Sequence, residues 1–175
     1  MKMYFIELLE REIQNLFLII WPPLGERDSK NIDISLGLVL EGGKEMFVVT
    51  TNKDDNWTPL IVKENIPSKY FSADFYYDRI SRWENCEIDA IIDREYYDFT
   101  NSELFNDIVG QKILDIEWIT VKGLSPFGIK LNFEKDYIIS TPISDGNTIE
   151  TKRFNVINNV DYYRLFGEIE YLRIC

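Results

Sequence analysis

The second half of this chain reads as a divergent copy of its first half, and this likeness constrains the fold more than any other feature. The two halves keep the same order of apolar runs, glycines and polar turns. The matching segments are residues 13–21 with 113–121, 36–40 with 127–131, 46–51 with 137–141, 73–77 with 160–163, and 87–89 with 168–170. Such a duplication predicts how the strands and helices are arranged, but it does not predict which residues bind or catalyse.

The predicted fold is α+β and mostly antiparallel, with two pseudo-symmetric copies of a helix–strand–hairpin unit. We expect residues 1–175 to form a single domain. It contains two divergent repeats, 4–93 and 102–175, and a joining segment, 94–101. The joining segment is too rich in Tyr and Phe for a flexible linker, so it is expected to pack. Because an isolated hairpin is only marginally stable in water, the copies are expected to share one core.

Apolar periodicity and turn signals predict the individual elements. The pair Gly42-Gly43 between two apolar runs predicts a hairpin. Strands are expected at residues 13–21, 34–40, 45–51, 60–62, 87–92, 112–121, 128–133, 136–141, 149–156 and 168–174. Short helical segments are expected at residues 4–12, 70–83 and 103–109, the second being a helix or an irregular cover. The third is expected to be capped by Asn101 or Ser102.

Histidine is absent from all 175 residues. Its absence excludes Ser-His-Asp and Cys-His catalysis and any zinc or iron site that uses His ligands. Carboxylate pairs, Lys, Tyr and Cys remain as possible catalysts. Because no motif of the chain arranges them for catalysis or for binding a cofactor or metal, we expect a protein that is not an enzyme and that has no cofactor and no metal.

The net charge of −11 comes from 30 acidic residues against 19 basic ones. Phosphate backbones repel such a protein, so direct binding to nucleic acid is not expected. The same charge accelerates encounter with a basic protein partner by long-range steering. The alternative interpretation is that the charge serves only solubility.

The stretch 83–101, in which acids outnumber bases, is the strongest candidate for an interaction surface. Aromatic rings interleaved with carboxylates suit protein binding, because the rings supply area to desolvate and the carboxylates capture Lys and Arg. The predicted partner-binding residues are Trp83, Glu84, Glu87, Asp89, Asp93, Glu95, Tyr96, Tyr97 and Asp98. The alternative is an edge strand blunted by charge against aggregation, with its rings facing inward.

The two cysteines, Cys86 and Cys175, lie near the last predicted strand of each copy. Two cysteines in a chain of this size do not make a disulfide framework, and we expect separate thiols rather than a bridge. Cys86 is a poor candidate nucleophile, because Glu84 and Glu87 disfavour a thiolate and no histidine can act as a base. It is expected to be a small buried side chain.

Loop carboxylates offer alternative chemistry. Asp54 and Asp55 share one loop, and Asp145 lies at the matching place in the second copy. Carboxylates brought together there would bind Ca²⁺ or act as the acid–base pair of a hydrolase, but Asp is also an ordinary turn residue, which is the interpretation we prefer. Together with Trp57, the Asp54 and Asp145 loops support the alternative function, a ligand- or carbohydrate-binding β domain.

In general character the chain resembles the immunity proteins of bacterial toxin systems, such as those of contact-dependent inhibition. Those proteins are often small, acidic, cytosolic and without a catalytic motif, and they neutralise a toxin by binding it. The resemblance carries over no residue. It implies a non-enzymatic, cytoplasmic protein that blocks a basic, nuclease-like toxin. We also expect a monomer or weak dimer, with no secretory signal and no membrane contact, because the apolar runs are too short to span a bilayer.

Overall fold

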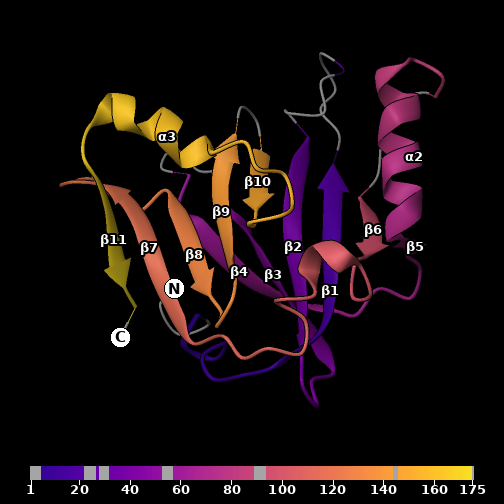
Figure 1. Ribbon diagram of the computed structural model, residues 1–175, viewed down its shortest axis with the longest axis horizontal. Coiled ribbons are helices and arrows are strands. Elements are labelled where there is room, and N and C mark those ends of the chain that lie inside the picture. The colour runs from indigo at the N-terminus through magenta and orange to yellow at the C-terminus, as the bar shows by residue number, and fades with distance from the viewer. Residues whose placement is uncertain are drawn as a thin grey trace.

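Two sheets of mostly antiparallel strands and a few short helices make up an α+β fold (Figure 1). The structure is a computed structural model that describes residues 5–21, 27, 32–52, 57–88, 94–143 and 146–174. The expected fold class, α+β with mainly antiparallel strands, is confirmed.

The first sheet has six strands. They are β1 (Ile13–Trp21), β2 (Asp33–Leu40), β3 (Glu45–Thr51), β4 (Pro59–Asn65), β5 (Phe71–Ser72) and β6 (Glu95–Asp98). Their order across the sheet is β4-β3-β2-β1-β6-β5, and only β5 and β6 run parallel. Side chains of both faces are buried over residues 16–20 of β1. The nearly continuous apolar sequence of β1 therefore suits its position inside the sheet.

The second sheet has five strands, all antiparallel to their neighbours. They are β7 (Asp115–Val121), β8 (Gly128–Asn132), β9 (Tyr137–Ile143), β10 (Gly146–Glu150) and β11 (Ile169–Arg173). Their order is β10-β9-β8-β7-β11. The two sheets meet where β10 runs beside β2, near the middle of Figure 1.

Short helices connect the strands. They are α2 (Ala73–Glu84), the 3₁₀ turn η2 (Glu103–Phe105), α3 (Asn159–Tyr163) and the 3₁₀ turn η3 (Arg164–Phe166). Helix α2 buries Tyr76, Ile80 and Trp83, whose spacing of three and four residues places them on one face. The Ser102 hydroxyl accepts a hydrogen bond from the Leu104 amide, which confirms Ser102 as the cap of the segment that follows.

The end of the first half differs from the prediction. Glu87 and Ile88 lie outside any strand, and the rest of the expected strand 87–92 falls outside the described residues. The segment 94–101, expected to join the copies, instead supplies β6, which pairs antiparallel with β1. Tyr96 and Tyr97 pack because they belong to the sheet, and Phe99, directly after β6, donates its amide to the Leu16 carbonyl of β1.

The expected strand 149–156 is shorter and begins earlier than predicted. Strand β10 starts at Gly146 and ends at Glu150. The hydroxyl of Thr151 accepts hydrogen bonds from the amides of Arg153 (3.1 Å) and Phe154 (2.9 Å). These local bonds turn the chain away from the sheet and end the strand.

The main hydrophobic core lies between the sheets and takes side chains from both. Aromatic residues dominate it, and Phe99 meets Phe105 and Phe154 edge to face at centroid distances of 5.6 and 6.0 Å. Two smaller clusters cover the outer faces. They contain Phe17, Ile19, Val39, Met46 and Val48 on the first sheet, and Ile119, Val121, Phe127 and Val160 on the second.

A buried amide, Asn147 of β10, joins the two sheets. Its side chain donates to the carbonyl of Ile34 (2.9 Å), and its carbonyl oxygen accepts from the hydroxyls of Thr51 (2.6 Å) and Ser140 (3.0 Å). Its backbone amide donates to Oδ1 of Asp33 at 3.0 Å. Because Asn147 is only 1 % exposed, water cannot easily replace these partners.

Replacing Asn147 with Ala is expected to lower the free energy of unfolding by roughly 2–4 kcal/mol, because buried donors and acceptors lose their partner. Urea unfolding followed by circular dichroism measures this loss. The matched control is Asn106→Ala, since Asn106 is exposed and its change is expected to stay within about 0.5 kcal/mol. Equal, small effects of the two substitutions would contradict a structural role for the amide.

Candidate functional site

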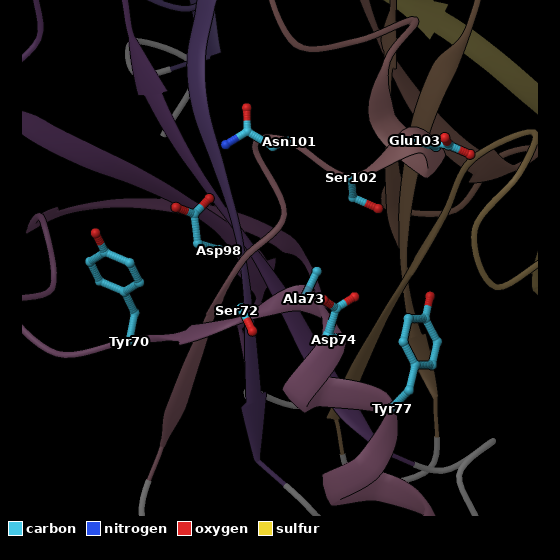
Figure 2. Close-up of a pocket in the computed structure, with 9 residues that line it drawn as sticks. All are labelled: Tyr70, Ser72, Ala73, Asp74, Tyr77, Asp98, Asn101, Ser102 and Glu103. Carbon is cyan, nitrogen blue, oxygen red and sulfur yellow. The ribbon is translucent and has the colours of Figure 1, made fainter.

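A hollow of about 530 Å³ opens where α2 begins and where the chain leaves β6 (Figure 2). We call it the acidic cleft. Its lining residues are Tyr70, Ser72, Ala73, Asp74, Tyr77, Asp98, Asn101, Ser102 and Glu103. They come from β5 and the residue before it, from the start of α2, from the end of β6 and from the start of η2 with the two residues before it. Segments about thirty residues apart in sequence therefore form one site.

Local hydrogen bonds shape the cleft. The parallel pairing of β5 with β6 places Ser72 opposite Asp98. At the end of β6, Oδ1 of Asp98 accepts from the amide of Thr100 at 2.9 Å, which turns the chain toward η2. On the other side, α2 starts directly after Ser72 with Asp74 in its first turn, where the helix dipole favours an acid.

The cleft has a strongly negative lining. Asp74, Asp98 and Glu103 line it, and no Lys or Arg is among the described residues that do. Among the described residues, none of these three carboxylates has an ion-pair partner within 4.0 Å. The acids of the cleft therefore retain a charge that elsewhere in this protein is often matched by a base.

Two tyrosines add aromatic surface to the carboxylates. The rings of Tyr70 and Tyr77 are 53 % and 50 % exposed. Tyr70 packs edge to face on Phe17 at 5.5 Å, and Tyr77 packs edge to face on Tyr76 at 5.2 Å. Because each ring packs against a buried ring, Phe17 or Tyr76, it can be presented to a ligand with little loss of conformational freedom. Carboxylates beside aromatic faces suit the ammonium of Lys or the guanidinium of Arg.

Two of the aromatic residues predicted to contact a partner are core residues instead. Trp83 is 1 % exposed and Tyr97 is fully buried. Trp83 lies on the apolar face of α2, and Tyr97 contacts the Tyr76 ring at 5.4 Å. Neither ring can serve as a surface anchor in this conformation, so both assignments are corrected.

The predicted acids do not gather at one place. Glu84 and Glu87 are exposed near the end of α2, and Glu87 lies 3.7 Å from Arg82. Glu95 is held by two hydrogen bonds from Arg79, at 3.0 and 3.3 Å. Of the seven predicted residues that the structure describes, only Asp98 lines the acidic cleft. Asp89 and Asp93 fall outside the described residues.

Tyr96 faces the other side of the first sheet. It packs with the outer cluster, and the Arg94 guanidinium lies over its ring at 5.3 Å. Burial raises the pKa of Tyr96. The same Arg94 makes two hydrogen bonds of 3.1 Å to Glu64, so this cation is already satisfied by an acid of the chain.

The structure says less about the loop residues of the alternative ligand-binding site and about the candidate thiol. Asp54, Asp55 and Asp145 fall outside the described residues, and Trp57 is half-buried with a φ of 49°. Cys86 is exposed, which corrects the expectation of a buried thiol.

In the part of the chain that the structure describes, no group of three or more His, Cys, Asp or Glu side chains is placed to hold a metal ion. No helix within those residues has the length and apolar character that crossing a membrane demands.

Eight of the nine residues that line the acidic cleft were not predicted as site residues, among them the two tyrosines, Tyr70 and Tyr77, and two of the three acids, Asp74 and Glu103. The aromatic segment 70–83 was expected to be a short helix or an irregular cover, and no site residue other than Trp83 was predicted in it. The sequence does show the spacing of the aromatic residues in this segment. The helix period places some of them on the outward face and others on the inward face, and this spacing could have indicated exposed rings.

No protein-family model, curated protein or solved structure matches this chain.

The buried Tyr97 hydroxyl, which donates to Glu95, predicts a pH dependence. Burial first, and this hydrogen bond second, raise the pKa of Tyr97 above the ordinary value of 10.0. The stabilisation is therefore complete below about pH 10 and is lost as the pH rises above it. In Tyr97→Phe, the free energy of unfolding is expected to fall less steeply between about pH 9 and 12 than in the wild type. Identical slopes in urea unfolding series would contradict this assignment.

Proposed function

We propose that this chain is a non-enzymatic binding protein that captures a basic protein partner in the acidic cleft. The partner we propose is a nuclease-like bacterial toxin domain, which the chain neutralises in the cytoplasm as an immunity protein. The observation that carries the proposal is the set of three carboxylates without ion-pair partners among the described residues, next to two half-exposed tyrosine rings.

Binding would proceed in two stages. The net charge of −11 steers a cationic partner toward the chain at a distance set by ionic strength. A Lys or Arg of the partner then enters the acidic cleft, where Asp74, Asp98 and Glu103 supply charge and Tyr70 and Tyr77 supply ring faces. Each cation placed over a ring contributes about 0.5–2 kcal/mol. A cation of the partner held in this way is no longer available to its own substrate.

The acidic cleft and the stretch 83–101 are both candidate docking surfaces for a basic partner. They differ in whether bases of the chain already pair with their carboxylates. Arg79 already compensates Glu95, and Arg82 lies near Glu87. An incoming cation would have to displace these bases, whereas at the acidic cleft it has no base of the described chain to displace. The cleft is therefore the better docking point for a basic partner.

The proposal is tested by removing the charge of the cleft without changing its shape. The variant Asp74→Asn/Asp98→Asn/Glu103→Gln keeps a carbonyl oxygen at residue 98 for the Thr100 amide. Its affinity for a ten-residue Arg-rich peptide, measured by calorimetry at low salt, is expected to fall by about tenfold or more. Raising the salt concentration is expected to weaken binding to the wild type more than binding to the variant.

The control variant Glu41→Gln/Glu45→Gln/Glu134→Gln removes the same number of charges from exposed positions at hairpins away from the cleft. It is expected to lose much less affinity, because only long-range attraction changes. Equal losses in the two variants would show that net charge, and not the cleft, binds the peptide.

The immunity role has a separate test. The product of a gene neighbouring the one for this chain is expected to stop growth when expressed alone. Co-expression of the wild type is expected to restore growth, and co-expression of the cleft variant is expected to restore it poorly. A harmless neighbouring product, or equal rescue by both forms, would count against neutralisation through the cleft.

We further propose that the two sheets are divergent copies of one unit. In each, four successive strands form a meander and a later strand returns beside the first: β6 beside β1, and β11 beside β7. A helix, α2 or α3, precedes each returning strand. On this proposal the first copy ends with β6, later than the sequence suggested.

Two glycines support the equivalence of the copies. Gly37 lies opposite Phe17, and Gly128 lies opposite Ile119, each pair joining the first and second strands of its meander. A Cβ at Gly37 would lie 3.2 Å from the Phe17 Cβ, and one at Gly128 would lie 3.3 Å from the Ile119 Cβ. The tightest contacts come from the third strand of each meander, at 2.5 Å from Met46 Sδ for Gly37 and 2.7 Å from Thr141 Cγ2 for Gly128, so at both places an added side chain would require a neighbour to move.

Sequences of diverse relatives of this chain provide the test. Profiles built separately for the two halves are expected to align with Gly37 opposite Gly128 and with β6 opposite β11. An alignment in another register, or one no better than that of shuffled halves, would contradict the duplication.

A further inference from the structure

Strand β11 lies at the edge of the second sheet, and no strand of the described residues pairs with its outward side. It pairs with β7 on one side and ends the strand order of the second sheet. The Lys122 amide donates to the Glu168 carbonyl, and the Ile174 amide donates to the Ile116 carbonyl. In an antiparallel ladder, alternate residues face the partner strand. The intervening residues Ile169, Tyr171 and Arg173 therefore direct their N–H and C=O groups away from β7.

These outward groups are self-complementary. If β11 pairs antiparallel with the same strand of a second copy, a two-fold axis through Tyr171 places Ile169 opposite Arg173 of the second copy. All the outward N–H and C=O groups of both strands are then paired. If the register between the two β11 strands shifts by two residues, some of the outward N–H and C=O groups at the strand ends are left unpaired. In the centred register Glu170 faces Leu172 of the second copy, so no like charges lie directly opposite each other.

An exposed apolar surface adjoins this edge. Leu165 and Phe166 of η3, which lead into β11, are 79 % and 62 % exposed, and Tyr162 is 60 % exposed. On β11 itself, Tyr171 and Leu172 are 40 % and 48 % exposed. The rings of Tyr162 and Phe166 lie 6.0 Å apart, so the helical residues form one patch.

The area of this surface suits a small dimer. Together these side chains expose roughly 500 Å² per copy, at the upper end of what monomeric proteins leave open. Two copies would bury roughly 1,000 Å², which is the lower limit for a specific interface. Antiparallel pairing of β11 also sets η3 of each copy beyond the far end of the other copy's strand, where its apolar side chains can be covered.

We propose that a second copy of this chain docks on β11 and η3, extending the second sheet across a two-fold axis. The interface is far from the acidic cleft, since β11 and α2 lie at opposite sides of the molecule in Figure 1. Each copy carries a net charge of −11, which opposes association at low ionic strength. The dimer is therefore weak, and added salt strengthens it, whereas salt weakens binding of a basic partner to the cleft.

The deciding variant is Tyr171→Pro in the full chain. The Tyr171 N–H points away from β7, so proline removes a donor of the dimer and none of the β7 ladder. In sedimentation equilibrium with a reductant present, the dissociation constant of the dimer is expected to rise by about tenfold or more. The control Tyr171→Thr keeps the N–H and the strand preference, and is expected to weaken the dimer less than proline does.

A second variant tests the patch. Leu165→Glu/Phe166→Glu is expected to abolish the dimer, and Val156→Glu, at a position 55 % exposed and outside the patch, is expected to leave it unchanged. Hydrogen exchange of the wild type supplies a measurement that needs no variant: the Tyr171 amide is expected to exchange more slowly as protein concentration rises. A wild type that stays monomeric at millimolar concentration in high salt would overturn the proposal. A dimer that survives Tyr171→Pro unchanged would overturn it too. Neither result bears on peptide binding at the cleft.

Discussion

The structure depends on a single buried amide at the place where its two sheets meet. Asn147 extends from β10 and bonds to β2 and β3 of the first sheet while keeping a bond to Ser140 of its own. An amide buried in this way fixes the relative position of the sheets, because any sliding leaves donors and acceptors unpaired. The core between the sheets, and α2 on that core, depend on this alignment: Tyr76 of α2 reaches Phe154 of the second half at 6.4 Å. The acidic cleft, at the start of α2, is thus positioned in part by the hydrogen bonds of Asn147.

Local patterns in the sequence were sufficient for most of the strands. The apolar run of β1, the Gly42-Gly43 turn and the second hairpin each depend on neighbours within a few residues, and each was predicted with close boundaries. The return of β6 to β1 could not be predicted in the same way. A four-residue strand has too few positions to show a period, and its partner lies in a distant part of the chain. Tertiary pairing, rather than propensity, makes it a strand.

The residues of the acidic cleft were harder to predict from the sequence than the strands of the fold. Asp98 was predicted because it lies in an acidic run, but its neighbours in the cleft come from α2 and from the segment before η2. The sequence also could not show which acids are compensated. Arg79 forms an ion pair with Glu95, and this pair offsets the charge that made Glu95 a candidate. Likewise, the helix period that turns Trp83 inward leaves Tyr77 at the surface.

The junction at Asn147 has a consequence for how the chain folds. The bond from its backbone amide to Asp33 spans 114 residues, and the pairing of β6 with β1 also closes a long loop. Loop-closure entropy opposes such contacts until much of the chain is already ordered. A topology of this high contact order folds on a timescale of about milliseconds to seconds. The two sheets are therefore expected to become rigid together, in one cooperative step, rather than one after the other.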